Sequence, residues 1–148
     1  LRMGKSDVGD VHSRMPKFGL GDILPIKSGT GAIQFVATGS MVKKAIDLSS
    51  HYRDSGVWSA PTIKAINAEH VANLCRGSEL IVTMEEHSIH GGLGSTIAEI
   101  AAERSPVRIC RIGIADRFSQ HCGTYAYLMK EHGLDIDSVK AKIDSFLM

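Results

Sequence analysis

Short apolar runs alternate with amphipathic stretches along most of this chain. Residues 32–38 and 79–84 are almost continuously apolar, a pattern typical of strands that are buried on both faces. Residues 57–63 form a third strand candidate, in which Pro61 is expected late because proline cannot donate to a central ladder. In residues 107–112 apolar and basic residues alternate, which predicts a strand nearer an edge with Arg108 and Arg111 facing outward. A shorter strand is expected near residues 22–26.

The stretches between these runs have helical spacing. The first predicted helix starts after Ser40, a potential N-cap, and ends near Tyr52. Asn67 is a potential cap for a second helix that ends near Gly77, and a third helix is predicted over residues 91–104. Residues 124–132 predict a short helix closed by Gly133. The last helix, residues 135–147, has an apolar face formed by Ile136, Val139, Ile143 and Phe146.

This alternation predicts an α/β fold in three αβα layers. The sheet should have about five strands and be mostly parallel, with one antiparallel edge strand. Residues 1–31 are rich in Gly, Lys, Asp and Ser and poor in apolar residues, so we predict a connecting arm over residues 1–21 and a domain over residues 22–148.

Composition excludes several classes of function. The net charge of +1 provides no field that would attract nucleic acid or an anionic membrane, and no apolar run approaches the roughly 18 residues of a membrane span. Three cysteines without a Cys-x-x-Cys pair argue against a disulfide framework and against a structural zinc site. We therefore expect a cytoplasmic protein without a metal site.

The candidate chemistry lies between residues 83 and 99, where the strand predicted over residues 79–84 leads into a helix. Gly91, Gly92 and Gly94 precede that helix, so backbone amides there could bind an anion, but the same glycines would also suit a tight turn. The segment contains neither the dinucleotide fingerprint nor a Walker loop, and Ser95 is not part of a nucleophile elbow.

The polar residues before this turn allow three interpretations. Glu85, Glu86, His87 and His90 could bind a metal, but their spacing does not match the zincin pattern. A carboxylate could orient an imidazole for acid–base catalysis, or the segment could hydrogen-bond to a neighbouring domain. Loops after parallel strands meet at one edge of a sheet, so Gly39, Ser40 and Asp116 should lie close to Glu86 and His87.

Together these segments resemble the C-terminal domain of the transketolase family. The resemblance covers roughly residues 18–147 and rests on four segments in the family's order: residues 36–42, 81–95, 111–118 and 133–135. One departure is Ile63-Lys64-Ala65-Ile66-Asn67, where the family usually has Ile-Lys-Pro-Leu-Asp, although Asn67 can still cap the helix.

The resemblance implies an α/β domain that packs on other domains. In this family thiamine diphosphate and a divalent cation bind between a diphosphate-binding and a pyrimidine-binding domain, both outside these residues. The family's C-terminal domain has no catalytic residue and contributes to a dimer. Residues 1–21 would then be an arm from an upstream pyrimidine-binding domain, so that the chain begins at a domain boundary. Arg2 matches an arginine that contacts the sugar-phosphate substrate, a role that suits a bidentate guanidinium.

We therefore expect the parent enzyme to transfer a two-carbon ketol unit between sugar phosphates, and this domain to serve structure and assembly. The partners implied are the upstream domains or a separate subunit, and a second copy in a homodimer. The alternative is a partner- or anion-binding regulatory module. In either case the contact residues would come from the carboxyl ends of the strands: Gly39, Ser40, Glu86, His87, Gly91, Gly92, Gly94, Ser95 and Asp116.

Overall fold

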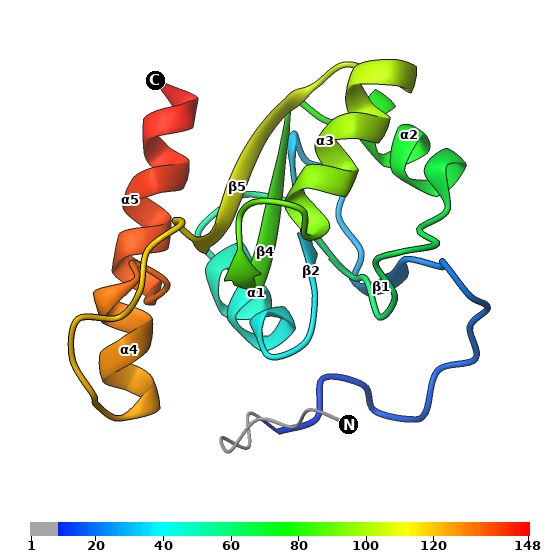
Figure 1. Cartoon of the computed structure of the whole chain (residues 1–148). Helices are drawn as coiled ribbons and strands as arrows, with labels where there is room; N and C mark the ends of the chain where they lie inside the picture. The colour runs from blue at the N-terminus through cyan, green and yellow to red at the C-terminus, as the bar shows by residue number, and fades with distance from the viewer. Residues whose placement is uncertain (1–8) are drawn as a thin grey trace.

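A computed structural model describes residues 9–148 and contains one five-stranded sheet (Figure 1). The strand order is β1-β3-β2-β4-β5, in which β2 to β5 are parallel and β1 pairs antiparallel with β3. The predicted αβα class and the antiparallel edge strand are confirmed. The strands are β1 (Leu24–Lys27), β2 (Ile33–Ala37), β3 (Gly56–Ser59), β4 (Leu80–Ser88) and β5 (Arg108–Ile114).

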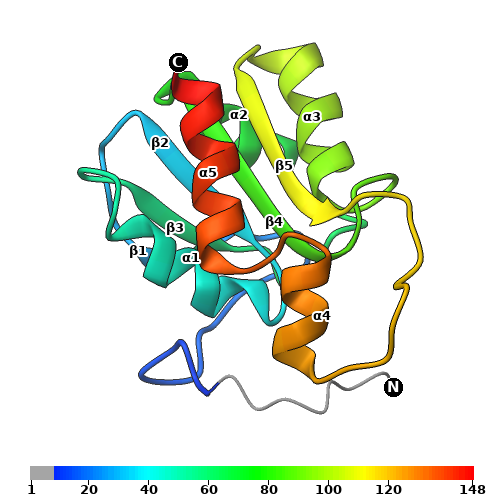
Figure 2. The same ribbon diagram turned by 90° about the vertical axis from the view of Figure 1, so that its left-hand side faces the viewer.

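Five helices cover the two faces of this sheet. Figure 2 looks onto the face covered by α1 and α5, with α2 and α3 behind the sheet and α4 beside its lower end. In Figure 1 the carboxyl ends of the parallel strands lie at the bottom, on the side of α4. The helices are α1 (Met41–Ser49), α2 (Ala68–Arg76), α3 (Leu93–Arg104), α4 (Tyr125–Glu131) and α5 (Ile136–Leu147).

The core is divided between the two faces, because successive side chains of a strand point to opposite sides. On β2, Phe35 belongs to the cluster under α1 and α5, whereas Val36 belongs to the cluster under α2 and α3. All five residues of β2 are buried, as expected for the central strand. Val139 and Ile143 of α5 are fully buried, and Ile136 and Phe146 pack beside them, which confirms the predicted apolar face.

Side-chain caps define three helix starts. Asn67 accepts hydrogen bonds from the amides of Glu69 and His70, so the predicted cap of α2 is confirmed. Thr124 caps α4 and Asp135 caps α5 in the same way. Ser40 occupies the predicted N-cap position of α1, but its backbone is already helical and its hydroxyl makes no capping bond. Gly133 ends α4 with a φ of 68°, a left-handed conformation that favours glycine.

The structure corrects three further predictions. Helix α1 ends at Ser49 rather than near Tyr52. Strand β4 continues through Glu85, Glu86 and His87, which the sequence placed in a loop. Arg111 does not face outward: it lies half-buried, three residues from the exposed Arg108 and therefore on the opposite face of β5.

Residues 9–21 contain no helix or strand. They are joined to the domain at Gly21, whose amide donates to Thr62 Oγ1 at 3.0 Å and whose carbonyl accepts from the amide of Asn67 at 2.9 Å. Arg2 lies outside the described residues. Between residues 9 and 148, no helix has both the length and the apolar composition needed to cross a membrane.

Candidate functional site at the carboxyl edge of the sheet

The candidate site lies at the carboxyl edge, by which we mean the edge formed by the carboxyl ends of β2 to β5 and the loops that follow them. The last residues of β4 lie at its centre. Glu85 is 1% exposed, and its neighbour Glu86 is exposed. The period of two along the strand gives the two carboxylates different environments, because Glu85 points toward α3 and Glu86 toward α1.

The Glu85 carboxylate binds the N-terminus of α3. Its Oε2 accepts from the amide of Leu93 at 2.7 Å, and its Oε1 accepts from the amide of Gly94 at 2.8 Å. The first amides of a helix have no partner within the helix and lie at the positive end of its dipole. The Glu85 carboxylate therefore occupies the helix N-terminus at which the sequence would allow an external anion to bind.

Two glycines of the turn make room for this contact. A Cβ at Gly92 would lie 1.9 Å from Glu85 Oε2, and a Cβ at Gly94 would lie 2.7 Å from Thr83 Oγ1. Both distances are far below van der Waals contact, so neither position accepts a side chain without movement of its neighbours. The alternative of a tight turn thus explains why glycine is needed at positions 92 and 94.

Ser95 and Arg111 hold the other side of the turn. The Ser95 hydroxyl accepts from the amide of Gly91 at 3.0 Å and donates to the carbonyl of Ile89 at 3.1 Å. The Arg111 guanidinium donates to the same Ile89 carbonyl at 3.0 Å. These bonds fix the segment between β4 and α3 from inside the molecule.

Glu86 connects three elements at the carboxyl edge. Its Oε2 accepts from Ser40 Oγ at 2.5 Å and from the Tyr125 hydroxyl at 2.8 Å. Ser40 precedes α1 and Tyr125 begins α4, so one carboxylate oxygen joins residues that are far apart in the sequence. Burial raises the pKa of Tyr125, and the hydrogen bond to Glu86 raises it further.

Lys44 lies on the same side of the sheet as this bridge. Its ammonium donates to the carbonyl of Leu134, at the turn between α4 and α5. Burial lowers the pKa of Lys44, while the carboxylates of Asp135 and Glu86 act in the opposite direction. Lys44 is therefore a half-buried cation that interacts with two acidic groups.

The remaining predicted residues are not brought into one cluster. Gly39, His87, Gly91 and Asp116 are exposed, whereas Gly92 and Gly94 are buried beneath the turn. The His87 ring lies near the carbonyl of Ser88, and His90 uses only its backbone amide on Ser88 Oγ. Over the described range 9–148, no three His, Cys, Asp or Glu side chains are grouped so as to hold a metal ion.

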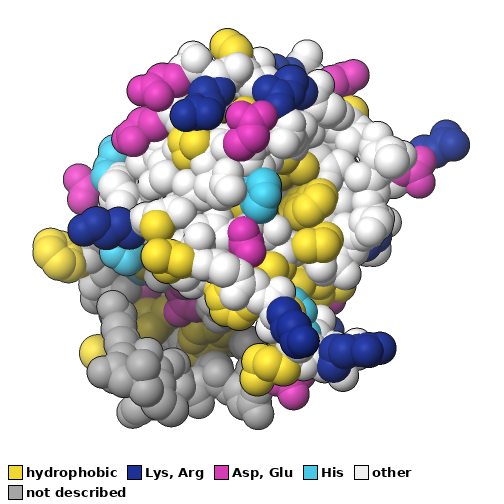
Figure 3. Space-filling model, turned by 90° about the vertical axis from the view of Figure 1, so that its right-hand side faces the viewer, with side chains coloured by type: hydrophobic (Ala, Val, Ile, Leu, Met, Phe, Trp, Pro, Cys, Tyr) yellow, Lys and Arg dark blue, Asp and Glu magenta, His cyan; other side chains and the backbone are white. Residues whose placement is uncertain are grey.

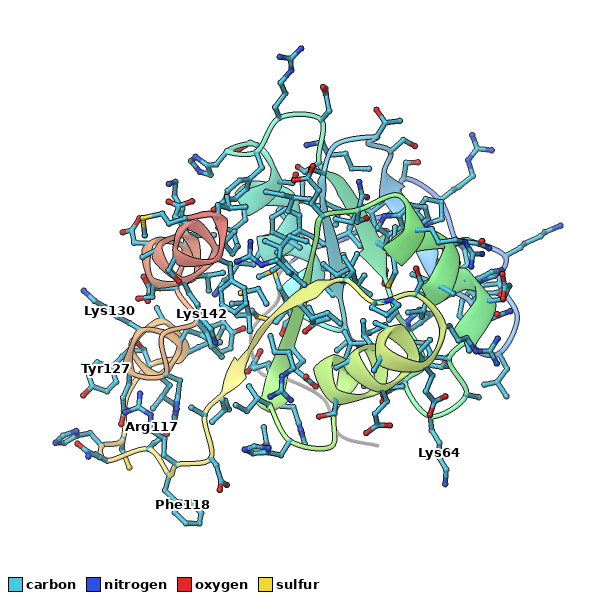
Figure 4. The ribbon with its side chains drawn as sticks, turned by 90° about the horizontal axis from the view of Figure 1, so that it is seen from above. Lys64, Arg117, Phe118, Tyr127, Lys130 and Lys142 are labelled. Carbon is cyan, nitrogen blue, oxygen red and sulfur yellow. The ribbon has the colours of Figure 1, made fainter. Side chains whose placement is uncertain are left out.

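Exposed aromatic rings extend this edge beyond the predicted residues. Phe118 is 96% exposed and Tyr127 is 45% exposed. Figure 4 shows the Phe118 ring pointing away from the body of the molecule and Tyr127 projecting from α4 on the same side. Arg117, between them, donates to the carbonyl of Glu131 and fixes the loop against α4. These rings are among the exposed aromatic groups that this edge presents to a neighbouring surface.

Sequence reasoning missed the partners of the two glutamates. Tyr125 was not singled out, although it follows the cap Thr124 on a helix that the sequence did predict. The opposite roles of Glu85 and Glu86 could have been found by continuing the period of two beyond Met84. Arg111 could have been placed by the same rule, since positions three apart on a strand face opposite sides.

Comparison with known proteins identifies the family of this architecture. A profile described as "Transketolase, C-terminal domain" matches residues 24–139. The chain belongs to the transketolase C-terminal domain family. The predicted resemblance is confirmed, and the matched range runs from β1 into α5.

Individual relatives agree with this assignment. One subunit of the apulose-4-phosphate transketolase of Actinobacillus succinogenes is 31% identical over 144 residues, covering 94% of this chain and 46% of the relative. 1-Deoxy-D-xylulose-5-phosphate synthase of Caldanaerobacter subterraneus subsp. tengcongensis is 33% identical over 141 residues, covering 92% of this chain and 22% of the relative.

A solved structure has the same fold. It is described as a split gene transketolase, inactive beta4 tetramer, and superposes with a TM-score of 0.86 at 30% identity. The match covers 95% of this chain and 47% of that chain. This chain therefore covers less than half of the length of each of these relatives.

Proposed function

We propose that this chain is the C-terminal domain of a thiamine-diphosphate-dependent, transketolase-like enzyme that transfers a two-carbon ketol unit between sugar phosphates. The observation that carries the proposal is the family match over residues 24–139, together with relatives whose names are those of a transketolase and of a deoxyxylulose phosphate synthase. The parent enzyme would act in the cytoplasm.

The residues of this domain do not fit the cofactor itself. A diphosphate needs free amides or cations, but the amides of Leu93 and Gly94 are bonded to Glu85. The divalent cation needs a cluster of oxygen ligands, and none is grouped within residues 9–148. In our proposal thiamine diphosphate and its cation are bound by the pyrimidine- and diphosphate-binding parts of the parent, and Arg2 contacts the substrate phosphate.

The role we assign to this domain is assembly through the carboxyl edge. Both glutamates of that edge already have partners within the domain: the buried Glu85 binds α3, and the exposed Glu86 joins Ser40 to Tyr125. What remains available to a neighbour is an exposed surface of Gly39, His87, Asp116, Phe118 and Tyr127. Exposed aromatic rings on an edge that internal hydrogen bonds hold in place are suited to contact with the upstream domains or with a second copy of the chain.

A ketol-transfer assay tests the first part of the proposal. The 148-residue chain, supplied with thiamine diphosphate, Mg²⁺, a ketose phosphate donor and an aldose phosphate acceptor, should show no turnover above the rate without protein. Turnover by this chain alone would overturn the division of labour that we propose.

The alternative of an anion-binding regulatory module is tested separately. Calorimetry with inorganic phosphate and with a sugar phosphate, on the wild type and on Gly92→Val, should give no binding heat for either protein. A phosphate-binding heat that Gly92→Val abolishes would instead support an anion site at the turn.

A further inference from the structure

A concave site lies at the opposite end of the sheet, away from the carboxyl edge. It is a cavity of about 520 Å³ between the C-terminal part of α2 and the segments that precede β2 and β4. Its wall includes Ile23, Thr30, Trp58, His70, Asn73 and Leu74. Figure 3 views the side of the molecule that carries α2 and shows hydrophobic side chains gathered on this face. A volume of this size is within the range of small-molecule sites.

The floor of this cavity is fixed by a buried glutamine. Gln34 is 4% exposed, and its Nε2 donates to the carbonyls of Gly29 and Gly31 at 3.2 and 3.0 Å. Its Oε1 accepts from Trp58 Nε1 at 2.9 Å. Every hydrogen-bonding group of this amide therefore has a partner, and the indole of Trp58 is held in one orientation.

Gly56 makes room for this arrangement. A Cβ at Gly56 would lie 2.1 Å from Gln34 Oε1 and 3.2 Å from Trp58 Nε1. The floor thus depends on a glycine in β3, a strand residue that provides no side chain to the core.

The residues that line the cavity indicate which kind of ligand it can bind. Among the described residues, no Lys, Arg, Asp or Glu lines the cavity, and His70, whose Nδ1 lies 3.9 Å from Asp22 Oδ1, is the one titratable residue of the wall. The wall therefore holds no permanent charge that would favour a phosphate or an ammonium group over a neutral ligand. Trp58 contributes an aromatic ring, which favours stacking against a flat partner. Thr30, His70, Asn73 and Ser78 provide polar groups around it.

We propose that the cavity between α2, β2 and β3 is a binding site for a neutral, planar heteroaromatic molecule that stacks on Trp58 and hydrogen-bonds to the polar groups around it. This site is independent of the carboxyl edge and of the proposed ketol transfer. No charged sugar phosphate is expected to bind there.

The experiment uses adenosine as the neutral heteroaromatic probe and ribose 5-phosphate as the charged, non-aromatic control. Trp58 is the only tryptophan of the chain, so its indole N–H signal in a ¹H–¹⁵N spectrum and its fluorescence both report on this cavity. Adenosine should shift the indole signal saturably, with a dissociation constant on the order of 0.1–1 mM for a ligand of this size. Ribose 5-phosphate should leave the signal unchanged.

Two variants and a matched control separate specific binding from surface stacking. Gly77 lines the cavity, and a Cβ there meets no atom within 4 Å, so Gly77→Leu adds bulk without a backbone clash. Gly77→Leu should weaken adenosine binding at least tenfold, and Asn73→Leu, at an exposed position of α2, should do the same. Ala102→Leu adds a similar side chain to the exposed face of α3 and should leave binding unchanged.

The proposal is overturned by any of three results. The first is the absence of a saturable shift of the Trp58 signal up to about 5 mM adenosine, a concentration several times the expected dissociation constant. The second is adenosine binding that is equally strong in both cavity variants and in the wild type. The third is a shift with ribose 5-phosphate that equals the shift with adenosine. If the Gly77→Leu protein does not fold, the adenosine affinity of Asn73→Leu relative to the wild type tests the proposal.

Discussion

At the scale of single residues, Glu85 explains the most prominent segment of the sequence. It is a nearly fully buried carboxylate whose two oxygens bind the amides of Leu93 and Gly94. Residues that look catalytic in a sequence can thus have a structural role, because the free amides at a helix N-terminus need hydrogen-bond acceptors such as a carboxylate. The candidate active site becomes a support for α3.

Replacing Glu85 by alanine should destabilise the fold strongly. The change leaves two buried amides without acceptors and removes a buried side chain, so we expect a loss of about 2–4 kcal/mol in the free energy of unfolding. Urea denaturation followed by circular dichroism measures it. Glu86→Ala, one residue along the strand and exposed, is the matched control and should cost less than about 1 kcal/mol. Equal losses would contradict the role given to Glu85.

Gly92→Ala tests the close approach of the turn to that carboxylate. The added Cβ would lie 1.9 Å from Glu85 Oε2, so the variant must break the hydrogen bonds or shift the helix start, at a cost of about 2 kcal/mol or more. Gly77→Ala, whose Cβ meets open space, should be neutral or slightly stabilising. The effect of Gly92→Ala should shrink in a Glu85→Ala background, since the two residues contact each other. Additive effects would show that the clash lies elsewhere.

At the scale of elements, the apolar pattern predicted the strands and helices well because each core element has a clear period. Strand β2 is a continuous apolar run, and α5 has a regular buried face. The pattern failed where polar side chains continue an element. Strand β4 extends through Glu85 and Glu86 because hydrogen bonds to α3, Ser40 and Tyr125 satisfy these carboxylates, and such partners are visible only in three dimensions.

The cap of α5 gives a pH-dependent prediction at this scale. The hydrogen bond from Ser138 lowers the pKa of Asp135 below its ordinary 3.8. The cap therefore stabilises the fold above about pH 4, and its contribution is lost as the pH falls through the lowered pKa. Asp135→Ala should cost about 1 kcal/mol at pH 7. The cost should decrease when urea unfolding is repeated near about pH 3, below the ordinary pKa of an aspartate.

Asp135→Asn provides the control for that experiment. Asparagine can accept the same hydrogen bond from the Ser138 amide but does not titrate. It should retain most of the stability at neutral pH and show a weaker dependence on pH than the wild type. An unchanged pH dependence in Asp135→Asn would assign the acid sensitivity to other carboxylates.

At the scale of the whole molecule, the parallel strands gather their loops at one edge. This convergence was predicted from the parallel direction of the strands, and the hydrogen bond between Ser40 and Glu86 agrees with it. The bond from Tyr125 to the same carboxylate was not predicted. The exposure of Phe118 could not be predicted from the sequence, because a phenylalanine ring is more often buried than exposed. The edge whose two glutamates are bonded within the domain thus also exposes aromatic rings, which is the basis for a docking role.

The central claim is that this aromatic carboxyl edge is an assembly surface. Size-exclusion chromatography with multi-angle light scattering tests it across a range of protein concentrations. We predict a mass that rises above the 16.0 kDa of one chain as the concentration increases, and a Phe118→Ser/Tyr127→Ser variant that stays at 16.0 kDa. A wild type that remains at the mass of one chain at every concentration, or a variant that associates equally well, would contradict the account.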